Sequence, residues 1–242
     1  MALSFSLPNY TSILVKGVDS EKLLQGQISC DLALNKRYFD GLFCNEKGYI
    51  ITNAVIIKDD FFTIIVKKSV SEFLKAELEK FAKFFNCEVS EKNQNIYGEC
   101  KNKVFKKHLG KKDFQETNIE WDFQTMKNFC FDIEEQHSNK FRINELGYNF
   151  EDYISYDKGC YRGQEIIARL TYLGKKVKKA VVFNNAIESI SDSSGKKIGK
   201  KIFEIKSRKL NLTQFFVEEN EYYHEGKKII PVSNQWEQNQ DL

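Results

Sequence analysis

Three apolar segments separated by very short connections constrain the fold of this chain more than any other feature of its sequence. Residues 38–44, 49–57 and 61–66 are rich in β-branched and aromatic side chains, which are typical of strands. Gly48, in the first connection, supplies the positive φ that a tight turn requires. Because a parallel pair needs a long crossover, strands joined this closely pair antiparallel. The sequence therefore predicts a three-stranded antiparallel meander.

Helices are predicted before and after this meander in the sequence. Ser69 and Glu72 form an S-x-x-E capping box, and an apolar stripe at helical spacing follows it as far as Phe85. Asp19 follows a predicted strand over residues 11–16 and is placed to cap another helix. Apolar residues also recur at helical spacing over residues 121–131 and 164–172.

The pattern changes after residue 178. Short predicted strands over 180–184, 197–206 and 212–218 are separated by Asn, Ser and Gly clusters. We therefore expect an α+β domain over residues 1–178, followed by a short, all-β domain over residues 179–242.

Composition excludes several classes of protein. With 242 residues, 41% hydrophobic and 29% charged, the chain can bury a core without disulfides or metals. Its six cysteines are scattered, form no C-x-x-C pair and accompany only three histidines, so we predict no metal site. We see no signal peptide and no apolar run of about 18 residues, the length of a membrane span. A cytoplasmic, membrane-free protein is expected.

The positive charge is unevenly distributed. The chain carries a net charge of +3, yet residues 174–209 hold eleven Lys and Arg against three Asp and Glu, a local charge of +8. The basic stretch 175–209 can attract tRNA through its phosphates, which makes a basic RNA-binding module one possible function. Scattered lysines that form an ordinary solvated face are the alternative.

One cysteine lies in a position that suits a reactive thiol. Cys160 precedes a helix predicted to begin near Gly163 or Gln164, where free amide hydrogens and the helix dipole favour a thiolate. Lys158 and Arg162 can add positive charge. Gly159 and Gly163 allow a tight turn that exposes the sulfur. The alternative is a buried, inert cysteine in a glycine-rich turn.

The segment around Cys160 resembles a known family. Lys158-Gly159-Cys160-Tyr161-Arg162-Gly163-Gln164-Glu165 is similar to the K-G-C-Y-x-G-Q-E signature of the YgfZ family, relatives of the glycine-cleavage T-protein. Residues 17–27 resemble the family's G-x-D-S-x-x-x-x-Q-G-Q segment, and Lys47-Gly48 resembles its K-G turn. The resemblance implies a T-protein-like folate-binding α+β fold, in which helices pack on antiparallel sheets, with a small C-terminal β-barrel module.

The resemblance also implies roles for individual residues. The two tryptophan positions that contact folate in the family fall on Trp121 and on Tyr10, where this chain departs from the pattern but keeps a ring that can stack on a pterin. Gln25 and Gln27 can donate amide hydrogen bonds to a ligand. Arg169 matches an arginine that commonly follows the signature, and it can pair with a folate glutamate tail or with Glu165. Core packing of the rings and solvation of the amides are the alternatives.

A further departure concerns enzymatic activity. T-proteins carry an Asp-Asp pair where this chain has Thr52-Asn53, and neither of these side chains acts as a general base at neutral pH. The sequence therefore disfavours a folate-dependent aminomethyltransferase, which we keep as an alternative function.

The resemblance predicts an accessory protein that binds tetrahydrofolate or a derivative. It would support iron-sulfur enzymes such as tRNA methylthiotransferases, and hence tRNA modification, through the thiol of Cys160. A single thiolate cannot hold a cluster alone, so we predict no permanent metal. We expect this thiol to be supported by the residues around it: Lys158, Gly159, Tyr161, Gly163, Gln164, Glu165 and Arg169.

Overall fold

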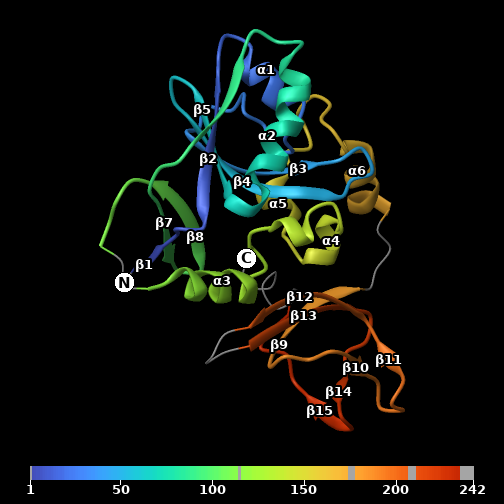
Figure 1. Cartoon of the computed structure of the whole chain (residues 1–242). Coiled ribbons are helices and arrows are strands. Elements are labelled where there is room, and N and C mark those ends of the chain that lie inside the picture. Colours follow the sequence, from blue (N-terminus) through green and yellow to red (C-terminus); the bar gives the residue numbers. More distant parts are fainter. Residues whose placement is uncertain (1, 114–115, 174–177, 207–210, 235–242) are drawn as a thin grey trace.

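The computed structural model describes residues 2–113, 116–173, 178–206 and 211–234. Both ends of the basic stretch 175–209, and the last residues of the predicted C-terminal domain, therefore lie outside the described part. The chain forms helices packed on antiparallel sheets, which confirms the predicted α+β class (Figure 1). Within the described ranges, no helix combines the length and the apolar character needed to cross a membrane.

The predicted meander forms three neighbouring strands of a five-stranded sheet, starting from its β3 edge. Strands β3 (Tyr38–Cys44), β4 (Ile50–Lys58) and β5 (Phe62–Lys67) pair antiparallel in sequence order. Strand β2 (Tyr10–Lys16) pairs with β5, and β6 (Glu88–Lys92) forms the far edge. Gly48 has the positive φ, +71°, that the turn before β4 was predicted to need. The meander is thus confirmed.

Helix α2 (Lys68–Ala82) covers one face of this sheet, but the predicted capping box is wrong. The N-cap residue is Lys67, and Ser69 lies inside the first turn. Because β5 runs into α2 without a loop, Ser69 has no place outside the helix. Its Oγ instead accepts a hydrogen bond from the backbone N–H of Glu135, at 3.4 Å.

Helix α1 (Ser20–Gln25) also begins where it was predicted but is capped differently. Asp19 holds the N-cap position, yet its side chain accepts no hydrogen bond from the helix. Its Oδ2 accepts the backbone N–H of Asn86 at 2.8 Å, so it connects the start of α1 to the segment after α2.

A second sheet of three strands stands beside the first. Strands β1 (Leu3–Ser6), β7 (Ile96–Lys101) and β8 (Val104–Leu109) pair in the order β1-β7-β8. The second strand of the β7-β8 hairpin lies in a lysine-rich segment. Helix α3 (Asn118–Lys127) packs on this sheet through Trp121, and a Cβ added at Gly98 would lie only 2.4 Å from the indole.

The C-terminal strands form two four-stranded sheets. One contains β9 (Lys179–Asn184), β12 (Lys200–Lys206), β13 (Asn211–Val217) and β16 (Ser233–Asn234). The other contains the short strands β10 (Ile190–Ser191), β11 (Lys197–Ile198), β14 (Tyr222–His224) and β15 (Lys227–Ile229). A core rich in Val, Ile and Phe joins the two sheets.

The first of these sheets also shares a core with the N-terminal part. Phe203 and Phe216 pack in one cluster with Leu42 and Phe131. Three short helices follow α3 in the chain: η1 (Glu135–His137), α4 (Ile143–Leu146) and α5 (Phe150–Tyr153). Figure 1 shows α4 and α5 between the five-stranded sheet and the C-terminal strands, where α4 contacts β9 and α5 contacts β3.

Two glycines hold the segment that contains Cys160 against the first hairpin. Gly163 precedes helix α6 (Gln164–Leu173) with φ +84°, and a Cβ at this position would lie 2.6 Å from the carbonyl oxygen of Asn45. A Cβ at Gly48 would lie 2.9 Å from Ile166 of α6. The K-G turn and the C-Y-R-G segment, far apart in sequence, therefore pack directly on each other.

We expect Gly163→Ala to lower the free energy of unfolding by about 1–3 kcal/mol, because a side chain there is strained by the positive φ and meets backbone. Gly159→Ala is the matched control, since a Cβ at Gly159 meets no atom within 4 Å and its φ is not positive. Urea denaturation of both variants measures the difference. Equal stabilities would contradict the packing described for Gly163.

Candidate functional site

The sulfur of Cys160 is exposed, on a loop that is anchored from beneath by Lys158. The Lys158 ammonium is buried and donates to the carbonyl oxygens of Gln25, Ile28 and Cys30, at 2.9, 2.6 and 2.8 Å. Burial lowers its pKa to about 8. An ammonium has three hydrogens, and all three are used here. Lys158 therefore attaches the loop to the segment after α1.

The second cation beside Cys160 is also engaged elsewhere. The Arg162 guanidinium forms ion pairs with Glu77 of α2 at 2.7 Å and with Glu46 of the hairpin turn at 2.6 Å. The expectation that Arg162 supports the thiol rests on charge alone, since its polar hydrogens point to these carboxylates. The hydrogen bonds and ion pairs of Lys158 and Arg162 thus anchor the Cys160 loop.

The other predicted supports of Cys160 have different environments. Tyr161 is buried in the core, and its backbone N–H donates to Oε1 of Gln164 at 3.2 Å, which closes the turn before α6. Glu165 and Arg169 are exposed on α6, and neither forms an ion pair with another described residue. Gly159 lies in open space.

The side-chain amides of Gln25 and Gln27, which were predicted to bind a ligand, differ in their hydrogen bonds. The Gln25 side chain binds the segment that follows α1: its Nε2 donates to Asp31 and its Oε1 accepts from the N–H of Leu32 at 3.0 Å. Gln27 is partly buried, and its side-chain amide makes no hydrogen bond to a described residue. Since the N–H of Arg162 donates to the Gly26 carbonyl at 3.1 Å, Gln27 lies beside the Cys160 loop.

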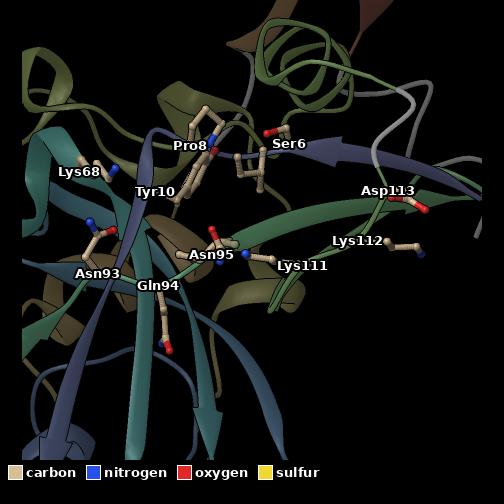
Figure 2. A pocket seen from close by; sticks show the side chains of 12 residues that line it. Ser6, Pro8, Tyr10, Lys68, Asn93, Gln94, Asn95, Lys111, Lys112 and Asp113 are labelled. Atoms are coloured by element: carbon tan, nitrogen blue, oxygen red, sulfur yellow. The ribbon is translucent and has the colours of Figure 1, made fainter.

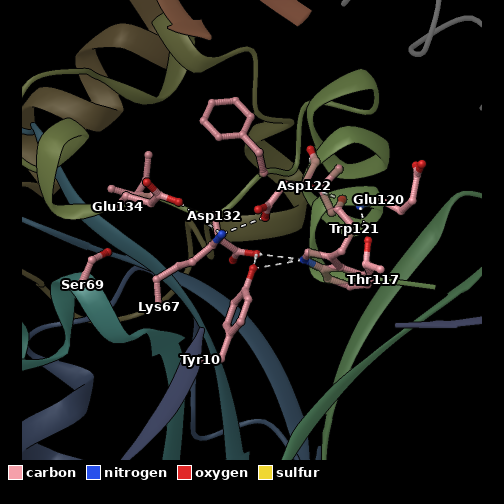
Figure 3. Close-up of polar contacts among 12 residues, drawn as sticks. Tyr10, Lys67, Ser69, Thr117, Glu120, Trp121, Asp122, Asp132 and Glu134 are labelled. Carbon is pink, nitrogen blue, oxygen red and sulfur yellow. Dashed lines mark hydrogen bonds and ion pairs between the residues drawn. The ribbon is translucent and has the colours of Figure 1, made fainter. Parts of the chain in front are cut away.

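The two predicted pterin-contacting positions meet in the interior. The Tyr10 hydroxyl donates to Oδ2 of Asp132 at 2.6 Å, and the Trp121 indole N–H donates to that hydroxyl at 3.1 Å (Figure 3). Both side chains are only 1% exposed. Figure 1 places α3, which carries Trp121, well away from α6 and the Cys160 loop. The structure thus brings Tyr10 and Trp121 together, but not with Cys160.

Asp132, which the sequence did not single out, organises this site. Its Oδ1 accepts from the Lys107 ammonium at 2.6 Å and from the Asn53 amide at 3.0 Å, while Tyr10 and Trp121 bind Oδ2. Burial alone would raise the pKa of Asp132, but Lys107 and these donors hold it below its usual range. With about four acceptor sites on a carboxylate, all are filled.

The side chain at position 53 has a structural role. The Asn53 amide binds Asp132, and its Oδ1 accepts the backbone N–H of Ile133 at 2.9 Å, so it fastens this segment to β4. The Thr52 hydroxyl donates to the Asn53 carbonyl. A carboxylate is therefore present beside β4, but it comes from a different segment and has no free oxygen with which to accept a proton.

Asp132 also lines a small cavity of about 190 Å³. The Lys67 ammonium lies between two carboxylates there, 2.7 Å from Asp122 and 3.3 Å from Glu134. Burial raises the pKa of Asp122 to about 6, against the attraction of Lys67. Phe203 of β12 lines the same cavity, so both the N-terminal part and the C-terminal strands contribute to it.

A larger cavity of about 650 Å³ lies at the end of the β1-β7-β8 sheet (Figure 2). Tyr10 lines this cavity too, together with amides from Asn93 and Asn95 and with Lys68 and Lys111. Tyr10 thus lines the larger cavity, and its hydroxyl bonds to Asp132, which lines the smaller one.

Comparisons with known proteins agree with this architecture. No protein-family model matches the chain. In structure, the chain is similar to the glycine cleavage system aminomethyltransferase T from Bartonella henselae, with a TM-score of 0.71 over 94% of this chain and 83% of that one, at 14% identity. The fold is therefore that of the T-protein, as the motifs implied.

Sequence relatives point to one branch of T-protein-like proteins. The tRNA-modifying protein YgfZ of Aliivibrio fischeri is 24% identical over 251 residues, 82% of this chain and 78% of its own. YgfZ of Escherichia coli O157:H7 is 25% identical, covering 70% and 68%. An uncharacterized protein of Haemophilus influenzae is 27% identical, covering 76% and 74%. These matches support the resemblance to YgfZ at low identity.

We expect Asp132→Asn to lower the free energy of unfolding at pH 7 by about 3–5 kcal/mol, because it leaves the Lys107 charge buried without its partner. Asp132→Asn combined with Lys107→Met should recover part of this loss, since both charges are then removed. Denaturant unfolding gives both values. A single variant as stable as the parent would contradict the central role of this carboxylate.

The ion pair between Asp132 and Lys107 predicts that the stability of the protein depends on pH. The pKa of Asp132 is lowered in the folded state, so its contribution is complete above the unfolded-state pKa of about 3.9 and is lost as pH falls below it. The difference in stability between the parent and Asp132→Asn should therefore shrink below about pH 4. Denaturant titrations at pH 7, 5 and 3.5 measure it, and a constant difference would contradict the lowered pKa.

Proposed function

We propose that this protein binds a reduced folate and supports tRNA modification, without transferring the one-carbon unit itself. One observation carries the proposal. Three positions that the sequence connected with folate chemistry, Tyr10, Asn53 and Trp121, lie on different elements of a T-protein fold and converge on Asp132. This carboxylate lines the cavity of about 190 Å³, which is the site we assign to the pterin ring. Tyr10 and Trp121 do not line this cavity, so in our proposal they hold Asp132 in place and do not stack on the pterin.

The chemistry of the cavity suits a pterin. The 2-amino and N3–H edge of a pterin donates two parallel hydrogen bonds, and carboxylates accept such pairs. Lys67 binds Oδ1 of Asp122, while Oδ2 receives no hydrogen bond from the described residues, so Asp122 is the acceptor we propose. The rings of Phe131 and Phe203, with centroids 4.4 Å apart, supply an aromatic wall. The tail of the folate would extend outward past Lys206.

The site favours binding over aminomethyl transfer. Asn53 is an amide, and Asp132 is fully occupied by its four donors, so neither is free to take a proton from a reacting amine. The similarity to aminomethyltransferase T is one of fold, and one fold can carry different activities. The names of the YgfZ relatives support a role in tRNA modification.

Cys160 is proposed as the second functional element. Its sulfur is exposed on a loop held by Lys158, Arg162 and Gly163, which presents the thiol without covering it. The thiol would serve iron-sulfur enzymes such as tRNA methylthiotransferases. Because Cys160 lies away from the pterin cavity, folate binding and the thiol function should be separable by mutation.

Calorimetric titration with tetrahydrofolate under anaerobic conditions tests the pterin site. We expect Asp122→Asn to weaken binding by about 10- to 100-fold, the value of one or two charge-assisted hydrogen bonds. Binding by the parent should also weaken below about pH 6, because protonation of Asp122 removes the acceptor. Glu120→Gln, on the same helix but directed away in Figure 3, is the control. No binding by the parent, or rapid turnover of a folate adduct, would overturn the proposal.

Complementation of cells that lack the protein tests the thiol. We expect Cys160→Ala to keep the fold and the folate affinity while abolishing the restoration of methylthiolated tRNA nucleosides, measured by mass spectrometry. Cys87→Ala, which changes a half-buried cysteine, should restore them fully. Full restoration by Cys160→Ala would show that the thiol has no such function.

A further inference from the structure

Three aromatic rings lie in a row where the edges of the two N-terminal sheets face each other. Tyr97 and His108 are direct partners across β7 and β8, and their rings stack with centroids 5.0 Å apart and planes 23° apart. Tyr38, on the edge strand β3, contacts His108 edge-on at 6.2 Å. Tyr38 is 43% exposed, far more than a ring that serves only core packing. We call these three residues the aromatic row.

The aromatic row lies on the outer face of the β1-β7-β8 sheet. Gly98 and Phe105 face α3, since both contact Trp121. Because side chains alternate along a strand, Tyr97 and His108 point to the opposite face. That face is not covered by α3, and Val104 and Lys106, which point to it by the same alternation, are exposed.

The surroundings of the row are strongly basic. Residues 101–112 contain six lysines and no Asp or Glu. Of these, Lys107 points inward to Asp132, whereas the other five are exposed. The Lys112 ammonium lies 5.5 Å from the Tyr97 ring centroid, and the Arg37 guanidinium lies 5.3 Å from that of Tyr38. Glu99 and Asp59 pair with these two cations and offset only part of the charge.

The row leads into the larger cavity. Tyr97 and Ser6 are partners across β7 and β1, and Ser6 lines the cavity of about 650 Å³. Lys112 both lies over Tyr97 and lines that cavity. Figure 2 shows the amides of Asn93 and Asn95 and the ammonium of Lys111 on its wall. These groups can donate to and accept from the edge of a nucleobase.

We infer that this surface binds a single-stranded segment of RNA. Bases would stack on the exposed ring of Tyr38 and against the partly exposed rings of Tyr97 and His108. Phosphates would contact the exposed lysines, and one nucleotide would enter the larger cavity. The rings and charges indicate single-stranded nucleic acid, and the choice of RNA rests on the proposed function in tRNA modification. The surface is distinct from the basic stretch 175–209.

Fluorescence anisotropy with labelled 12-nucleotide RNA, in the absence of folate, tests this inference on the full chain. We expect Tyr97→Ala and Tyr38→Ala each to weaken binding by about 5- to 100-fold, the range for one stacked base. Tyr97→Phe, which keeps the ring, should retain most of the affinity and controls for folding. Lys101→Ala with Lys106→Ala should weaken binding and flatten its salt dependence.

Two controls separate this inference from its alternatives. Lys196→Ala with Lys197→Ala, in the C-terminal basic stretch, should leave RNA binding unchanged, and Asp122→Asn should do the same. Loss of binding in the C-terminal variant, or full binding by Tyr97→Ala, would overturn the assignment to the aromatic row. Equal affinity for DNA of the same sequence would overturn the assignment to RNA.

Discussion

The buried carboxylate of Asp132 is the interaction on which the centre of this molecule depends. A charge in the interior is costly unless it is paired and hydrogen-bonded, and four donors surround this one. Those donors come from β2, β4, β8 and α3, so one side chain unites both N-terminal sheets and the helix beside them. The network also fixes the position of Asp132 itself, which lines the cavity of about 190 Å³.

The buried ammonium of Lys158 is a second charge of this kind, and it holds the Cys160 loop in place. Lys158 binds three carbonyl oxygens of the segment after α1, and Arg162 joins the loop to α2 and to the hairpin turn. Several residues of the motif that resembles a chemical signature therefore have structural roles: Lys158, Arg162 and Gly163 hold the loop in place, and Cys160 is exposed on it. The molecule thus presents a cavity and a thiol from one scaffold, at separate places.

The chain shares its fold with aminomethyltransferase T, and one fold can carry different activities. At position 53 an amide fastens Asp132 to β4, so the carboxylate at the centre is consumed by structure. Asp122 and Glu134 lie on either side of Lys67 in the cavity at the border with the C-terminal strands. In the function we propose, this cavity binds the polar edge of the pterin, and Asp132 takes no part in proton transfer.

Local sequence determined the elements: the meander, α2, α6 and the C-terminal strands follow from residue periodicity and short turns, which depend only on neighbouring residues. Sequence motifs also marked Tyr10, Trp121 and the Cys160 loop. Tertiary structure alone decided that Tyr10 and Trp121 meet at Asp132, that Lys158 and Arg162 are anchors, and that Lys67 replaces Ser69 at the start of α2. The physical reason is that these contacts join residues up to about 130 positions apart, and a charge buried by a distant segment has no local pattern that distinguishes it from one left in water.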